Sequence, residues 1–90
     1  MLQIIIIHEP NSVHISEVRD LETSTSLATY DGNKKATDLS CLESHIDETI
    51  LVTHFVRNLI GGCTRLDYEQ ERTLTEVGTD ENGLMYVQYN

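Results

Sequence analysis

Four consecutive isoleucines, Ile4 to Ile7, constrain this chain more than any other feature of its sequence. The branched Cβ of isoleucine fits a pleated sheet and disfavours a helix, and an unbroken apolar run indicates a strand that is covered on both faces. We therefore predict a central β-strand over residues 3–8. The run is far shorter than the ~20 apolar residues of a membrane-spanning helix, so we expect a soluble chain.

Turn residues divide the chain after this strand. Residues 9–12, Glu-Pro-Asn-Ser, predict a tight turn, because proline fixes one corner and Asn and Ser close turns through their side chains. A weak alternation of apolar and polar residues over 13–21 predicts a second, less buried strand. A third short strand is predicted over 27–30, ending at the Asp-Gly-Asn turn of residues 31–33.

Residues 41–60 show the apolar spacing of an amphipathic helix. Ser40 and Glu43 have the spacing of a capping box, and Gly61 and Gly62 have the chemistry of a helix end. We predict a single long helix here whose apolar face packs on the isoleucine strand. The stripe consists of Leu42, Ile46, Ile50, Phe55, Val56, Leu59 and Ile60.

The last third of the chain predicts strands. Residues 66–77 alternate with a period of two, although a helix fits the same residues, and the Asn-Gly pair before residues 84–89 is a strong hairpin signal. Together the elements predict one domain, residues 1–90, of the α+β class. We expect an antiparallel sheet of four to five strands with one long helix on one face, and no parallel pairing.

The four histidines, His8, His14, His45 and His54, suggest a metal site only weakly. No pair has the spacing of zinc ligands, and nine residues of helix would place His45 and His54 on opposite faces. We therefore predict structural histidines, with no metal and no cofactor.

The two cysteines, Cys41 and Cys63, fall at opposite ends of the predicted helix. That placement separates them by roughly 30 Å, which excludes a disulfide within the chain and suits a reducing cytosol. A thiol at a helix N-terminus has a depressed pKa. No oxyanion loop or orienting residue accompanies either cysteine, so we predict that the chain is not an enzyme and has no catalytic residue.

Acidic residues dominate the charge, with 15 Asp and Glu against 6 Lys and Arg and a net charge of −9. This balance argues against binding to free nucleic acid, which requires a cationic surface. Residues 67–81 carry one cation, Arg72. They also carry six of the carboxylates: Asp67, Glu69, Glu71, Glu76, Asp80 and Glu81.

Alternate carboxylates on one face of a strand are ~6.5 to 7 Å apart, which is close to the spacing of phosphates along a nucleic-acid strand. The segment could therefore act as a decoy for a nucleic-acid-binding groove. An acidic strand face also keeps a protein soluble and protects a sheet edge from aggregation, and that interpretation carries at least equal weight. If the acidic residues do not bind the partner, the aromatic surface around Tyr86 and Tyr89 is the other candidate.

The small size, the acidity, the cysteines outside any Cys-x-x-Cys motif and the absence of a catalytic signature resemble the anti-CRISPR and anti-restriction proteins of bacteriophages. Residues 2–11 and 43–62 are similar to a type I-F anti-CRISPR protein. This resemblance implies a non-enzymatic inhibitor in the cytoplasm of a bacterial host. It would be a monomer, and it would bind the Cas proteins of a type I surveillance complex, near the crRNA, and block target DNA. The shortness of the longest apolar run, Ile4 to Ile7, predicts no membrane partner.

Two other classes of function stay open. A small structural or assembly protein would form a homo-oligomer through an edge strand such as residues 84–89. A small enzyme or ligand-binding domain is the third possibility.

Overall fold

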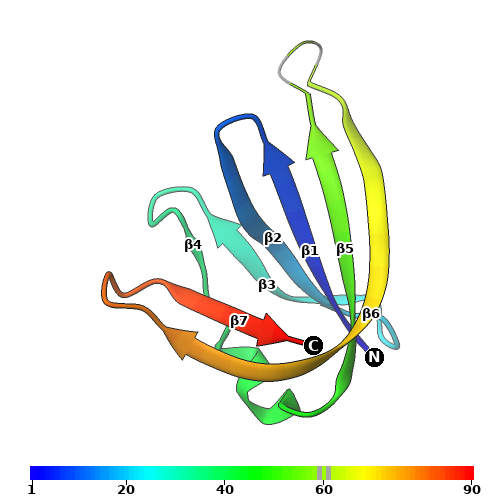
Figure 1. The fold of residues 1–90 in the computed structure, drawn as a ribbon, viewed down its shortest axis with the longest axis vertical. Coiled ribbons are helices and arrows are strands. Elements are labelled where there is room, and N and C mark those ends of the chain that lie inside the picture. The colour runs from blue at the N-terminus through cyan, green and yellow to red at the C-terminus, as the bar shows by residue number, and fades with distance from the viewer. Residues whose placement is uncertain (59, 61) are drawn as a thin grey trace.

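The isoleucine run forms the middle strand of a seven-stranded sheet, as its composition predicts. The computed structural model describes residues 1–58, 60 and 62–90, and its sheet curls into a nearly closed barrel (Figure 1). The strand order is β4-β3-β2-β1-β5-β6-β7. The strands are β1 (Leu2–Glu9), β2 (Ser12–Asp20), β3 (Thr25–Asp31), β4 (Ala36–Thr37), β5 (Thr49–Arg57), β6 (Thr64–Thr79) and β7 (Met85–Tyr89).

The predicted α+β class is wrong, because the helix over residues 41–60 does not form. A short 3-10 helix, η1 (Ser40–His45), and strand β5 occupy that segment. Residues 49–57 are rich in β-branched side chains, which favour a sheet, and Ile50 and Val52 also fit a period of two. The predicted capping box is absent, since η1 has no side-chain cap, and the Ser40 amide bonds to Asp38 instead.

Gly62, expected at the end of that helix, therefore lies in a loop. Gly62 adopts a φ of 64° in the loop between β5 and β6, a conformation that favours glycine. Gly61 lies outside the described residues.

The expectation of a purely antiparallel sheet is also wrong. β1 and β5 run parallel, with Ile4 opposite Val52 and Ile6 opposite His54. Parallel neighbours need a long crossover connection. Strands β2 to β4 and η1 provide it here, where a helix usually does.

The core fills the inside of the curled sheet. From β1 and β5 it takes Ile4, Ile6, Ile50 and Val52. Leu39, just before η1, and Leu42, on η1, join the core together with Leu74 of β6. In Figure 1, η1 lies at the lower end of the barrel. The remaining buried members are Leu2 and Val18.

The predicted apolar stripe is divided by this arrangement. Leu42 and Ile50 are buried, and Ile46 packs against the core from its edge. Phe55 is half-buried on the opposite face of β5, because it is out of phase with Ile50 and Val52. Leu59 lies outside the described residues.

Strand β6 pairs with two different strands along its length. Residues Thr64 to Thr73 pair with β5, and Leu74 to Thr79 pair with β7. Figure 1 shows that β6 bends between these two parts and carries β7 around toward β4. The predicted strand over residues 66–77 and the predicted C-terminal hairpin are confirmed.

Within the described chain, no helix is long and apolar enough to cross a membrane.

We predict that Leu42→Ala lowers the free energy of unfolding by ~2 to 5 kcal/mol, because Leu42 is fully buried and the cavity left behind cannot collapse completely. Urea denaturation followed by circular dichroism measures the change. Leu21→Ala is the matched control, since Leu21 is 40% exposed and should cost far less. Equal losses in the two variants would contradict the placement of η1 against the core.

Candidate protein-binding face

The acidic segment follows the outside of β6. Glu69 and Glu71 lie opposite Thr53 and Leu51 of β5, on the face away from the core. Asp67 is the extra residue at a bulge, where the pairing with β5 shifts by one position. All three carboxylate residues are exposed. The structure therefore places Glu69 and Glu71 on one face, as predicted, and interrupts the regular spacing at Asp67.

Hydrogen bonds fix the position of one of these carboxylates. The Gln3 amide donates to the Thr53 hydroxyl over 2.8 Å, and that hydroxyl donates to Glu69 Oε2, also over 2.8 Å. The orientation of Glu69 on β6 is thus fixed by a chain of hydrogen bonds from two other strands, β5 and β1. A fixed carboxylate loses less side-chain entropy when it binds a partner.

The other three acidic residues are separated by the bend in β6. Glu76 is exposed on the outer face, and Glu81 is exposed in the turn before β7. Asp80 has a structural role, because its Oδ1 accepts hydrogen bonds from the backbone amides of Asn82 and Leu84, each at 2.9 Å. All six predicted residues are therefore exposed, and Asp80 is the one whose carboxylate holds the turn before β7.

The two candidate tyrosines point to opposite faces. Tyr86 is outside and 36% exposed, and its ring covers Gly78, where an added Cβ would lie 2.7 Å from Tyr86 Cζ. Tyr89 is opposite Leu74 and packs against the core. Only Tyr86 can belong to the outer face that carries Glu76.

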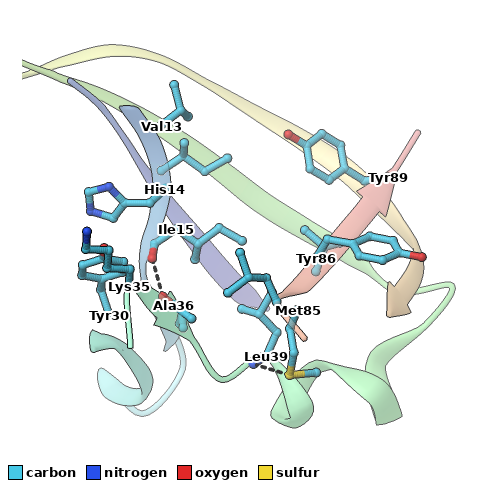
Figure 2. Close-up of a pocket in the computed structure, with 14 residues that line it drawn as sticks. Val13, His14, Ile15, Tyr30, Lys35, Ala36, Leu39, Met85, Tyr86 and Tyr89 are labelled. Carbon is cyan, nitrogen blue, oxygen red and sulfur yellow. Dashed lines mark hydrogen bonds between the residues drawn. The ribbon is translucent and has the colours of Figure 1, made fainter. Parts of the chain in front are cut away.

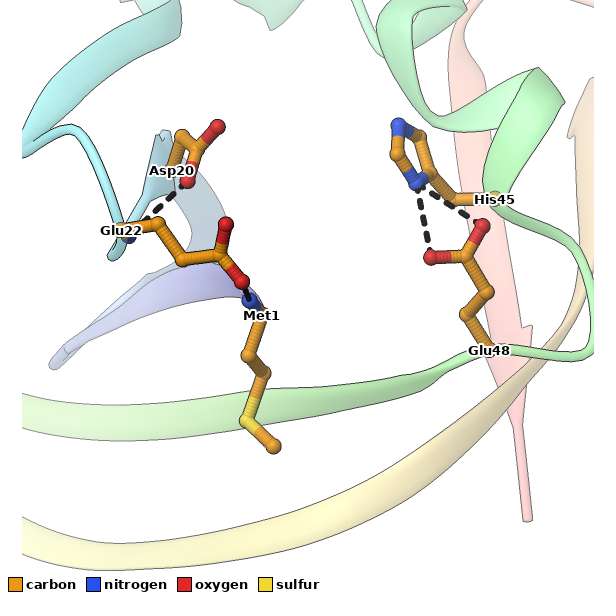
Figure 3. Close-up of polar contacts among 5 residues, drawn as sticks. All are labelled: Met1, Asp20, Glu22, His45 and Glu48. Carbon is orange, nitrogen blue, oxygen red and sulfur yellow. Dashed lines mark hydrogen bonds and ion pairs between the residues drawn. The ribbon is translucent and has the colours of Figure 1, made fainter.

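Cations neutralise carboxylates elsewhere but not on β6. The N-terminal amine of Met1 lies 3.4 Å from Glu22 (Figure 3), and Arg19 lies 3.1 Å from Glu17. Among the described residues, no ion pair involves any of the six acidic residues of the segment. The outside of β6 is consequently an uncompensated negative strip.

No sequence pattern indicates the contact that the structure forms between two histidines. His8 Nε2 and His54 Nδ1 are 2.7 Å apart, and the His54 ring stacks on Tyr68 with centroids 4.2 Å apart. Burial, and then the neighbouring His8, lower the pKa of His54, whereas Asp67 acts in the opposite direction. The parallel register of β1 and β5 brings His8 and His54 together.

No metal site accompanies this pair. Within residues 1–58, 60 and 62–90, no group of three or more His, Cys, Asp or Glu side chains could hold an ion. The expected separation of His45 and His54 by a helix is wrong, since the two residues lie on different elements, η1 and β5.

The environment of Cys41 differs from the one predicted. Burial, and then the charge of Asp38, raise the pKa of the Cys41 thiol, whereas a helix N-terminus would lower it. A raised pKa leaves less of the nucleophilic thiolate. The described residues contain no disulfide. The predicted separation of the two cysteines depends on a helix over residues 41–60, and that helix does not form.

Comparison with models of known protein families, with curated proteins and with solved structures finds no match for this chain.

We predict that the free energy of unfolding falls as the pH drops below about 6.5. A lowered pKa keeps His54 neutral in the folded chain, whereas the unfolded chain takes up a proton near the ordinary value of 6.5. The loss begins at that value and levels off below the lowered pKa. Denaturation at pH 7.5 and pH 5.5 measures it.

His54→Phe keeps a ring against Tyr68 and removes the titrating group, so the change in stability between the two pH values should shrink. Leu21→Ala is the control, because it removes no titrating group, and it should leave the change between the two pH values as it is in the wild type. An unchanged pH dependence in His54→Phe would show that His54 is not the group responsible for the loss of stability at low pH.

Proposed function

We propose that this chain is a non-enzymatic binding protein that docks the acidic strip of β6 on a cationic surface of a nucleic-acid-binding partner. The observation that carries the proposal is the exposed set Asp67, Glu69, Glu71 and Glu76, which has no compensating ion pair in the described structure. Structural surfaces usually mix charges of both signs. A strip of one sign steers association with a surface of the opposite sign.

The resemblance to type I-F anti-CRISPR proteins suggests the partner. We propose that it is the crRNA-guided surveillance complex of a bacterial host, in which Lys and Arg line the channel for guide and target. A monomer bound near the crRNA would occupy the site of target DNA. Alternate residues on β6 have the ~6.5 to 7 Å spacing that suits a groove built for phosphates.

Replacing Asp67, Glu69 and Glu71 together by their amides tests the proposal. The variant should associate with a type I-F surveillance complex about tenfold more slowly than the wild type at low salt, with a flatter dependence on salt, because charge acts mainly on the association rate. Surface plasmon resonance at several salt concentrations measures both quantities.

The matched control replaces Glu22, Glu43 and Glu48 by glutamine. This control changes the net charge by the same amount, but it does so at exposed residues outside the acidic strip. The control should associate at nearly the wild-type rate. Equal slowing of both variants would show that net charge alone matters, and an absence of wild-type binding would exclude this partner.

One observation favours a second candidate function, the assembly protein. β7 is the last strand of the sheet, so one of its edges has no neighbouring strand in the strand order. An open edge can pair with the same edge of a second copy. Size-exclusion chromatography with light scattering distinguishes the two functions: we expect a monomer, and a stable closed oligomer would favour assembly.

A further inference from the structure

An open cavity of about 330 Å³ lies at the seam of the barrel, between the two ends of the sheet. Figure 2 shows residues of β2 and of the β3–β4 region on one side and β7 on the other. The volume falls at the lower end of the range for small-molecule pockets. Apolar side chains line most of the wall, including Ile6, Ile15, Leu39, Met85 and Val87.

The polar groups at this cavity are neutral or cationic. None of the chain's 15 acidic residues lines the cavity, although the chain as a whole has a net charge of −9. His14, Tyr30 and Lys35 lie together at one side, opposite Tyr89 (Figure 2). The cavity therefore pairs apolar walls with a cationic corner.

Lys35 is the cation available to a ligand. His14 lies 3.8 Å from the Glu9 carboxylate, which Arg57 also approaches at 3.7 Å. Within the described chain, Lys35 forms no ion pair. Its charge is thus uncompensated beside an apolar wall.

The turn that presents Lys35 is well defined. Asp31 Oδ1 accepts hydrogen bonds from the backbone amides of Asn33 and Lys34, at 2.9 and 3.3 Å. Lys35 itself has a φ of 53°. These constraints fix the backbone from which the lysine side chain projects.

We propose that the cavity binds a small amphipathic anion, with an apolar chain or ring against Ile15, Leu39 and Val87 and a carboxylate beside Lys35. The apolar part gains from leaving water, and the carboxylate gains a charge-assisted hydrogen bond. This site is independent of the binding function proposed for β6.

Isothermal titration with decanoate and with decanol tests the proposal. Both molecules have the same chain length, and only decanoate carries the charge. Decanoate should bind more tightly, and Lys35→Gln should weaken its binding roughly tenfold while leaving decanol unchanged. Lys34→Gln is the matched control, because it removes the same charge from a neighbour that does not line this cavity.

Two further variants test the location. Ala36→Leu fills the cavity and should abolish binding of both molecules. Leu84→Trp places an indole at the cavity in a chain without tryptophan, and its emission should shift when decanoate binds. The second variant keeps the test decisive if the first one fails to fold.

Three results would overturn the proposal. The first is no binding of decanoate to the wild type. The second is an equal loss of decanoate affinity in Lys35→Gln and Lys34→Gln. The third is a dimer, detected by light scattering, that Ala36→Leu converts to a monomer while decanoate does not bind. That last outcome would make the seam an interface between two copies of the chain.

Discussion

The parallel pairing of β1 with β5 is the interaction on which the rest of the structure depends. It joins two strands from different halves of the chain and buries Ile4 and Val52 on the same face. The hairpin strands β2 to β4 extend the sheet on one side of this pair, and β6 and β7 extend it on the other. Because β6 bends, the two ends approach each other and leave a seam with a cavity between them.

The sequence predicted the local elements better than the long-range ones. Pro10, Gly32 and Gly83 mark turns whose chemistry is local, so the strands beside them could be found from short windows. Residues 41–60 carry apolar side chains that fit both a helical stripe and a strand alternation. Their β-branched side chains favoured the strand, but the spacing and the apparent caps favoured the helix.

The candidate site was predicted in part. Exposure of Glu69 and Glu71 on one face follows from the period of two on a strand, which was recognised. The bulge at Asp67, the structural role of Asp80 and the inward position of Tyr89 depend on pairing with other strands. The contact of His8 with His54 and the cavity at Lys35 depend on the topology itself. No pattern within a single segment encodes them.

Nuclear magnetic resonance of the labelled protein tests the central claim, the β1–β5 pairing, most directly. The structure predicts contacts between backbone protons of residues 3–8 and 51–56 in parallel register. It also predicts that the amides of these two strands, which are flanked on both sides, exchange among the slowest in the chain. Sequential amide–amide contacts and helical chemical shifts over residues 46–57 would contradict the account and restore the helix.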